Sequence, residues 1–308
     1  MTEVSTATLV ETLVRARALE DELAGLRPEG LPGELRGPLP VSPGVQAALA
    51  AARSRNPPDV LCLRRASPAA ALALGVSPVA LAHEAAGTSE AAAAGRSPGG
   101  VPGGPGTALI SAVDPPGTMI EVMAGVALAF RLRNEPRVAF LVDDADDAAS
   151  GYWHEGLNLA GVQRVPLVVV IDGGRRHALT AAVPRLSVRA PAYGVRAITV
   201  EGDDPRLVLE AIVEASGRAR GGDGTQLVEV VPGATGDGVD RLARMEPGLS
   251  DRLADFRRRA AVEAREAAEA ARAASPPGPE AARRSPWGTG EPVPPSWQPP
   301  PEPMETPS

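Results

Sequence analysis

Five acidic side chains follow two apolar segments, and they are the residues of this sequence best suited to chemistry. Four of them come directly after the segment Val138–Val142, namely Asp143, Asp144, Asp146 and Asp147. Asp172 follows the segment Val165–Ile171 in the same way. Carboxylates on loops are the ligands that hard divalent cations prefer. The candidate metal ligands are therefore Asp144, Asp146 and Asp172, although a solvated acidic turn explains the run after Val142 equally simply, and we favour it.

The three histidines and the single cysteine have plain structural interpretations. Cys62 lies in an apolar run and predicts a buried, inert thiol in a reducing compartment. His154 lies in a predicted helix and is interpreted as a structural or subunit-contact residue, and His83 as a residue of a helix surface. His177 is interpreted as an exposed residue beside two arginines. The sequence offers no Ser/His/Asp or Cys/His set for nucleophilic catalysis.

Basic residues and glycines give little evidence of a binding site. The chain has no lysine, so every basic side chain is an arginine, and an arginine cluster is weak evidence of function. Gly173-Gly174 follows a strand as phosphate loops do, but neither a GxGxxG pattern nor a phosphate-loop lysine accompanies it. The net charge of −7 argues against a nucleic-acid partner.

The order of elements that must position the acidic residues predicts an α/β fold. Near-continuous apolar strands alternate with helices, a pattern typical of a parallel sheet covered on both faces. The predicted strands are Asp59–Leu63, Thr107–Val113, Val138–Val142, Val165–Ile171, Ala197–Val200 and Gln226–Val231. The predicted helices are Ser5–Leu26, Gly44–Arg53, Ser67–Leu74, Pro78–Ala86, Met119–Leu132, Gly151 to about Val162, Pro205–Ala219 and Asp251–Ala274.

Composition divides the 308 residues into a core and peripheral segments. We expect an N-terminal helix and linker (1–36), an α/β core (37–240) with a mobile loop at about 87–106, and a C-terminal helix (241–274). That helix should lie on the surface or against a partner, anchored by Leu253 and Phe256. The Pro-rich tail (275–308) should be disordered, with Trp287 and Trp297 solvated within it. Neither a signal peptide nor a membrane span is evident, so we expect a cytoplasmic protein.

Several phrases of the sequence resemble one family in collinear order. They are GELRGPLPVSPGVQAALAAA (Gly33–Ala52), the helix and strand of Gly117–Phe140, YWHEGLNLAGVQRVPLVVVI (Tyr152–Ile171), RAPAYGVRAITVEGDDP (Arg189–Pro205) and the C-terminal segment Ala243–Glu280. The family is the alpha subunit of the thiamine-diphosphate-dependent, decarboxylating component of 2-oxo acid dehydrogenases. The resemblance runs from about Leu9 to Glu280 and implies the thiamine-diphosphate-binding type of fold, with Mg²⁺ and thiamine diphosphate as cofactors.

The resemblance fails where the family binds its cofactors. Its GDG motif falls on Asp144-Ala145-Asp146, so the metal-binding aspartate is replaced by Ala145. The asparagine that follows falls on Ala149, and the family's asparagine pair falls on Gly173 and Gly174. The segments that supply histidine near the cofactor read RASPAA (Arg65–Ala70) and PGATGD (Pro232–Asp237), both without histidine.

These losses predict a degenerate, non-catalytic alpha-subunit homologue with no cofactor of its own. The family works as an alpha2-beta2 heterotetramer, so the resemblance implies self-association or a beta-type subunit as the partner. The alternative is an active 2-oxo acid dehydrogenase alpha subunit with relocated metal ligands, such as Asp144 or Asp146 with Asp172. The substrate-facing positions are among those replaced, so the sequence does not name a substrate.

Overall fold

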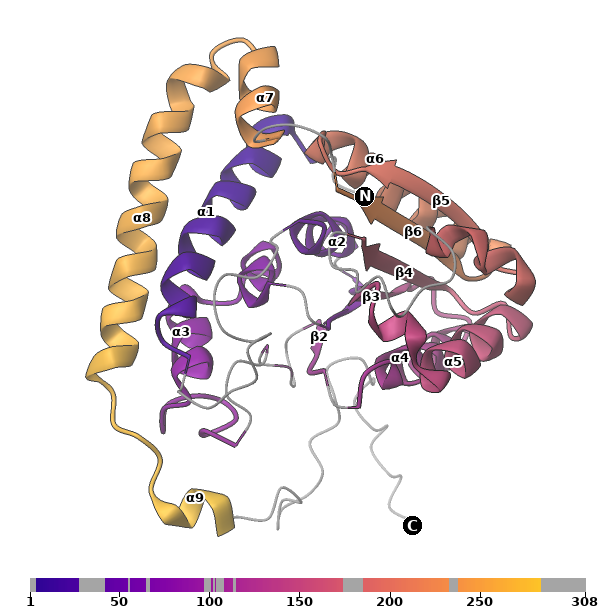
Figure 1. The fold of residues 1–308 in the computed structure, drawn as a ribbon, viewed down its shortest axis with the longest axis horizontal. Coiled ribbons are helices and arrows are strands. Elements are labelled where there is room, and N and C mark those ends of the chain that lie inside the picture. The colour runs from indigo at the N-terminus through magenta and orange to yellow at the C-terminus, as the bar shows by residue number, and fades with distance from the viewer. Residues whose placement is uncertain are drawn as a thin grey trace, which may run out of the picture.

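A six-stranded parallel sheet forms the centre of the computed structural model, which describes residues 4–27, 42–54, 56–64, 67–96, 101, 103, 108–112, 115–173, 185–232 and 238–283. The strand order is β2-β1-β3-β4-β6-β5, and every neighbouring pair is parallel (Figure 1). The strands are β1 (Val60–Leu63), β2 (Leu109–Ile110), β3 (Ala139–Asp144), β4 (Leu167–Asp172), β5 (Arg196–Glu201) and β6 (Gln226–Val231). The α/β fold expected from the sequence is therefore confirmed.

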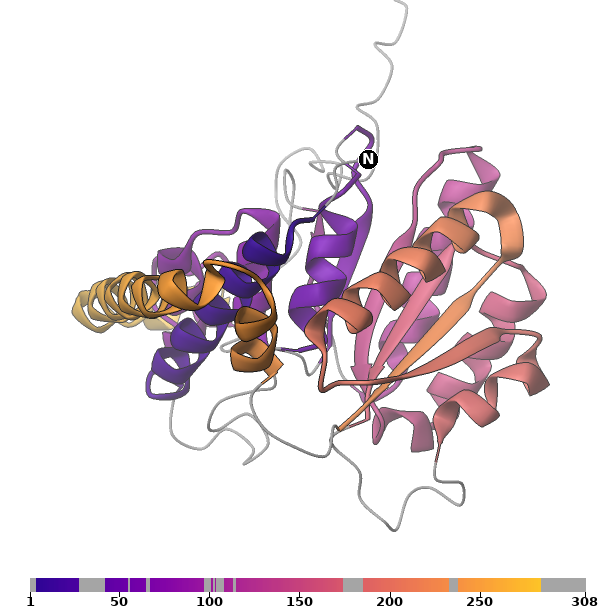
Figure 2. The ribbon, with the colours of Figure 1, turned by 90° about the horizontal axis from the view of Figure 1, so that it is seen from above.

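Helices cover both faces of this sheet, as Figure 2 shows from above. Helices α2 (Gly44–Ala51) and α6 (Pro205–Arg218) lie on the face that receives Phe140 and Val142. Helices α4 (Thr118–Leu132) and α5 (Gly151–Val162) pack on the opposite face. Because successive side chains of a strand point to opposite faces, strands buried on both sides must be apolar throughout.

Helices α4 and α5 approach each other closely because a glycine lies between them. A Cβ atom on Gly156 would lie 2.4 Å from Cγ2 of Ile120 and 2.8 Å from the backbone nitrogen of Glu121. The adjacent Trp153 is fully buried in the same layer. Val122 of α4 is 39% exposed, while Ile120 and Met123 of the same helix are buried.

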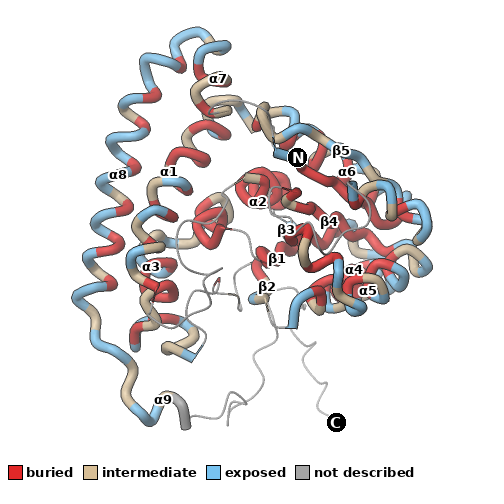
Figure 3. The backbone as a smooth tube through the Cα atoms, in the orientation of Figure 1, coloured by how far each residue is buried: buried red, intermediate tan, exposed pale blue. Residues whose placement is uncertain are grey.

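A further group of helices brings together segments from the N-terminal and C-terminal parts of the described chain. It contains α1 (Thr6–Ala24), α3 (Pro78–Ala86), α7 (Gly238–Met245) and α8 (Leu249–Ala273). Helix α8 runs beside α1 and also contacts α3, and its inward side is buried while its outer side is exposed (Figure 3). Besides Leu249, Leu253 and Phe256, its buried residues are alanines: Ala260, Ala264, Ala267, Ala268 and Ala271. The helix thus packs within its own chain, where its alanines allow a close approach.

Short elements complete the described chain. They are the 3-10 helices η2 (Pro68–Leu74), η3 (Asp147–Ala149), η4 (Leu186–Val188) and η5 (Ala190–Tyr193), the π-helical turn η6 (Ala219–Asp223) and helix α9 (Pro279–Arg283). Ser5 caps α1, because its Oγ accepts the backbone N–H of Thr8 at 3.1 Å. None of the helices in the described part of the chain has both the length and the apolarity to cross a bilayer.

Some predicted features lie outside the described residues. These are Gly174, His177, most of the segment Pro232–Asp237, and the tail from residue 284 with Trp287 and Trp297. Of the predicted loop at 87–106, the structure describes 87–96, 101 and 103. The mobility of that loop and the disorder of the tail stay predictions.

The amino ends of β1 and β3 are fastened by a buried ion pair. Asp59 is 1% exposed and accepts two hydrogen bonds from Arg220, at 3.2 and 2.6 Å, and one from the backbone N–H of Val138 at 2.8 Å. Burial raises the pKa of the Asp59 carboxyl, and the bonds from Arg220 oppose that rise. At this end of the sheet, one carboxylate, that of Asp59, is therefore paired with one cation, that of Arg220.

Candidate functional site

The carboxyl ends of β3 and β4 lie side by side, at the edge where ligands of open parallel sheets bind. Asp144 pairs in register with Asp172 at these two strand ends. The backbone N–H of Ala145 then donates to the carbonyl oxygen of Asp172 at 3.3 Å. The structure therefore brings together two of the three predicted metal-ligand candidates, while Asp146 follows in the turn and is half-buried.

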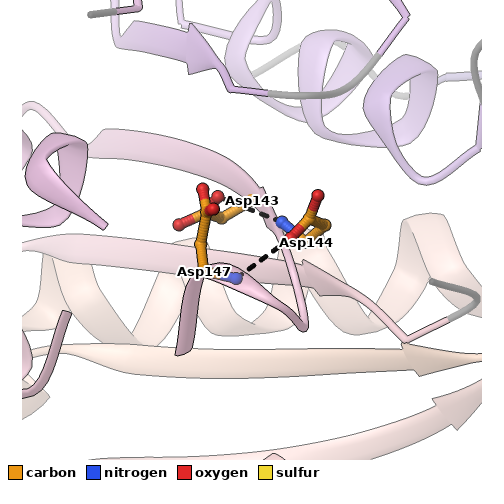
Figure 4. Close-up of side chains that lie close together, drawn as sticks. All are labelled: Asp143, Asp144 and Asp147. Atoms are coloured by element: carbon orange, nitrogen blue, oxygen red, sulfur yellow. Dashed lines mark hydrogen bonds between the residues drawn. The ribbon is translucent and has the colours of Figure 1, made fainter. Parts of the chain in front are cut away.

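Three carboxyl groups gather at the end of β3 and form a buried cluster. Asp143, Asp144 and Asp147 are 1–2% exposed, and one carboxylate oxygen from each lies within 4.8 Å of the others (Figure 4). We call these three residues the acidic cluster. The favoured expectation of a solvated acidic turn was wrong for them, because all three side chains are buried.

Local hydrogen bonds explain why the chain turns at this point. The Oδ1 atom of Asp144 accepts the backbone N–H groups of Asp146 at 3.0 Å and Asp147 at 3.1 Å. Aspartate favours such turns because its short side chain satisfies backbone donors two or three residues further on. Asp143 Oδ1 accepts the N–H of Asp144 at 3.0 Å. The acidic run thus builds its own turn, and two of its carboxylates serve as backbone acceptors.

An arginine from the neighbouring strand end reaches the acidic cluster. Arg64 follows β1 directly, and its backbone N–H donates to the carbonyl oxygen of Val142 at 2.8 Å. Its Nε atom lies 3.2 Å from Oδ2 of Asp147, and both side chains are at least nine-tenths buried. The sequence analysis missed this contact, because an arginine in a lysine-free chain carried no special signal.

The acidic cluster favours a protonated carboxyl group at Asp143. Burial raises the pKa of Asp143 well above its usual range, and the hydrogen bond and charge of Asp147 and the charge of Asp144 raise it further. Arg64 opposes this rise. Burial also raises the pKa of the neighbouring Cys62 thiol far above its usual range, with Asp143 contributing next. Cys62 is fully buried, as predicted, and its thiol has no thiolate character.

The positions that hold Mg²⁺ in the family do not fit a metal here. Ala145 offers no ligand atom, is 5% exposed, and belongs to the apolar cluster that contains Met119, Trp153 and Leu186. A Cβ atom on Gly173 would lie 2.7 Å from the backbone oxygen of Val230, so the backbone there leaves no room for an asparagine. Ala149 is exposed and equally without a side-chain oxygen. These positions do not provide the oxygen ligands that Mg²⁺ requires.

A buried glutamate holds the backbone at the start of η4 by hydrogen bonds. Glu229 of β6 is fully buried, and its two carboxylate oxygens accept the N–H groups of Leu186 at 3.0 Å and Ser187 at 2.9 Å. Nearby, Arg189 donates to the carbonyl oxygen of Ala148 at 3.4 Å. The sequence analysis missed both contacts, although a single charged residue within the apolar strand QLVEVV was a signal for a specific buried partner.

The described histidines have structural roles. Nδ1 of His154 hydrogen-bonds the hydroxyl of Tyr193, which links α5 to η5. His83 was expected on a helix surface, and that expectation was wrong, since it is 6% exposed. Its ring lies between Thr88, 2.9 Å from Nδ1, and Glu90, 3.4 Å from Nε2, because the chain after α3 folds back over it.

Comparison with known proteins identifies the fold and then the family. A transketolase from Pichia stipitis superposes with a TM-score of 0.50 at 14% identity, covering 87% of this chain and 46% of that one. The expected thiamine-diphosphate-binding type of fold is confirmed. The family described as dehydrogenase E1 component matches residues 45–232, which is more than half of the chain. The chain therefore belongs to the dehydrogenase E1 component family, and the resemblance seen in the sequence is confirmed.

The curated relatives are alpha subunits of dehydrogenases. The 2-oxoisovalerate dehydrogenase subunit alpha of Bacillus subtilis is 31% identical over 40% of this chain and 39% of its own length. The 3-methyl-2-oxobutanoate dehydrogenase subunit alpha of Mycobacterium tuberculosis is 32% identical over 43% of this chain and 41% of its own. The matches thus cover less than half the length of these relatives.

Proposed function

We propose that this chain is a non-catalytic member of its family, a pseudoenzyme that does not bind thiamine diphosphate and Mg²⁺ in the family manner. The observation that carries the proposal is the close approach of Gly173 to the backbone oxygen of Val230, because it excludes an asparagine at that strand end. Ala145, packed among apolar side chains, supports it at the neighbouring strand end.

The electrostatics of the strand ends support the same proposal. In the family the metal neutralises the diphosphate of the cofactor. Here the acidic cluster lies at the end of β3, where its carboxylates would repel a diphosphate. Under this proposal the protein has no cofactor, and we assign it neither 2-oxo acid decarboxylation nor a substrate.

We further propose that the protein acts as a structural or regulatory subunit, by self-association or with a beta-type partner. Helix α5 carries three exposed apolar side chains, Tyr152 (50% exposed), Leu159 (42%) and Val162 (69%). Such a helix face is typical of a subunit contact. The proposal includes a cytoplasmic protein without nucleic-acid or membrane partners. Analytical ultracentrifugation of the chain, alone and with a candidate beta-type subunit, tests the association.

Thermal unfolding with and without ligand tests the absence of cofactor binding. A ligand that binds only the folded state raises the unfolding temperature by mass action. We expect the same midpoint in buffer alone, with Mg²⁺, and with Mg²⁺ and thiamine diphosphate together. A midpoint that rises with cofactor concentration would contradict the proposal.

A second candidate is an active dehydrogenase alpha subunit with relocated metal ligands. The observation that favours it is the register of Asp144 with Asp172 at adjacent strand ends. Asp146 follows Asp144 two residues further along the chain. Oxidative decarboxylation of pyruvate or a branched-chain 2-oxo acid, with a cognate beta subunit and a lipoyl acceptor, is the corresponding assay. A well-folded complex without turnover would eliminate this candidate.

A further inference from the structure

Arg64 lies beside the acidic cluster, at the carboxyl edge of the sheet. It leaves the end of β1 beside the end of β3, since Leu63 pairs with Val142 in the parallel ladder. From there its guanidinium reaches Asp147, with 3.2 Å between Nε and Oδ2. The pair thus sets a positive charge at the edge of the acidic cluster, whose three carboxyl groups each have an oxygen within 4.8 Å of the others.

The acidic cluster is the kind of environment that requires a positive charge. Asp143, Asp144 and Asp147 are buried together, and buried carboxylates persist only when they are paired or hydrogen-bonded. The Oδ2 atom of Asp143 is buried, faces the Asp147 carboxyl group, and accepts no N–H group within the part of the chain that the structure describes (Figure 4). A cation placed among the three side chains would compete with the hydrogen bond between Asp143 and Asp147.

We propose that Arg64 is the resident cation of the acidic cluster and occupies the place that a divalent metal ion would otherwise take. A guanidinium is permanently charged and less strongly hydrated than an ammonium group, so it suits a buried ion pair. The inference rests on the proposed function in one respect, since both exclude Mg²⁺ from this edge. It goes further in naming the residue that excludes a cation from these carboxylates and in predicting that its removal creates a metal site.

The test compares Arg64→Met with the matched variant Arg220→Met. Both substitutions remove the arginine of an Arg–Asp pair and keep a long apolar side chain. Arg64→Met leaves three carboxyl groups together, whereas Arg220→Met leaves Asp59 alone at the other end of the sheet. The probe is MnCl2 alone, with no thiamine diphosphate. Thermal unfolding and the electron paramagnetic resonance signal of free Mn²⁺ report stabilisation and binding separately.

We expect the unchanged protein and Arg220→Met to ignore Mn²⁺. We expect Arg64→Met to unfold at a lower temperature in metal-free buffer, to regain stability as Mn²⁺ is added, and to remove free Mn²⁺ with a stoichiometry of one. Adding Asp143→Asn to Arg64→Met should weaken that binding at least tenfold. The inference is overturned if Arg64→Met responds to Mn²⁺ no more than Arg220→Met does, or if the unchanged protein binds Mn²⁺ through Asp143.

A double variant decides the case in which Arg64→Met yields no folded protein. Arg64→Met with Asp147→Asn removes both partners of the pair while keeping similar side-chain volumes. Folding of the double variant alone shows that the charge of Arg64 is what the cluster requires, and supports the inference. If the double variant is also unfolded, Arg64 acts through its shape, and the inference fails. Thiamine diphosphate binding by the unchanged protein would instead refute the proposed function, which this experiment does not probe.

Discussion

The two ends of the central sheet each contain a buried Asp–Arg contact, and they differ in how many carboxyl groups the arginine serves. At the amino end, Asp59 receives two hydrogen bonds from Arg220 and one from the N–H of Val138. At the carboxyl end, Nε of Arg64 lies 3.2 Å from Oδ2 of Asp147, which belongs to a cluster of three carboxyl groups. The amino end thus joins two strands through one carboxylate, whereas the carboxyl end places three carboxyl groups beside one arginine.

The largest effect is expected at the amino end. Arg220→Met leaves Asp59 buried without its cation, and breaking a buried ion pair by removing one partner costs about 3–5 kcal/mol. Urea unfolding measures the loss, and Asp59→Asn combined with Arg220→Met should recover part of it because the remaining group is neutral. A loss below about 1 kcal/mol would show that the pair contributes no more than a surface contact, and the contrast between the two ends would disappear.

Restoring the family's residues at the carboxyl end should destabilise the protein without restoring metal binding. In Gly173→Asn the new Cβ atom meets the backbone oxygen of Val230, and overpacking of this kind costs about 1–3 kcal/mol. Ala145→Asp buries a further carboxylate in an apolar cluster and should cost at least as much. Ala149→Asn, at an exposed position, is the control and should leave stability unchanged. Recovery of Mg²⁺-dependent stabilisation in the Gly173→Asn, Ala145→Asp double variant would contradict the account.

A smaller effect is expected at the contact between α5 and η5, which lies beside the carboxyl end. His154→Phe removes the hydrogen bond to the Tyr193 hydroxyl and keeps a ring of similar shape, so we expect a loss of about 1 kcal/mol. Tyr193→Phe removes the same bond from the other side and should not add to the loss in the double variant. Additive losses in a double-mutant cycle would show that the two side chains do not interact.

Asp143→Asn should change the pH dependence of stability more than stability itself. The pKa of Asp143 is raised in the folded protein. The folded state therefore keeps a proton that the unfolded chain releases at about pH 4. The stabilisation from this group is complete below that pH and is lost as pH rises through the raised pKa. Asparagine does not titrate, so the unfolding free energy of the variant should lack this decline. A pH profile identical to that of the unchanged protein would contradict a protonated Asp143.

The strands and their alternation with helices were predictable, because the apolar runs are nearly uninterrupted, as in Leu167–Ile171 of β4. The packing of α8 was not, because alanines such as Ala260 and Ala264 give no periodic signal that separates a buried face from an exposed one. The loss of ligands at Ala145 and Gly173 was visible in the sequence through the family resemblance. The burial of Asp143 was not, because acidic turns are usually solvated and the sequence alone does not show which part of the chain covers this one.

The role of Arg64 shows a further limit of sequence analysis. Every basic residue of the chain is an arginine, so residue type does not distinguish Arg64 from the arginines of the surface. Its contact with Asp147 depends on the parallel register of β1 and β3, which sets the two strand ends side by side. Contacts between strand ends that are about eighty positions apart in sequence require the topology of the sheet to be known.

We propose that this member of the dehydrogenase E1 component family does not bind the cofactors of that family. Isothermal titration calorimetry of the unchanged protein with thiamine diphosphate in the presence of Mg²⁺ tests this most directly, alone and after addition of a beta-type subunit. The account predicts heats indistinguishable from ligand dilution in both cases. A saturable binding isotherm with a micromolar dissociation constant would contradict it.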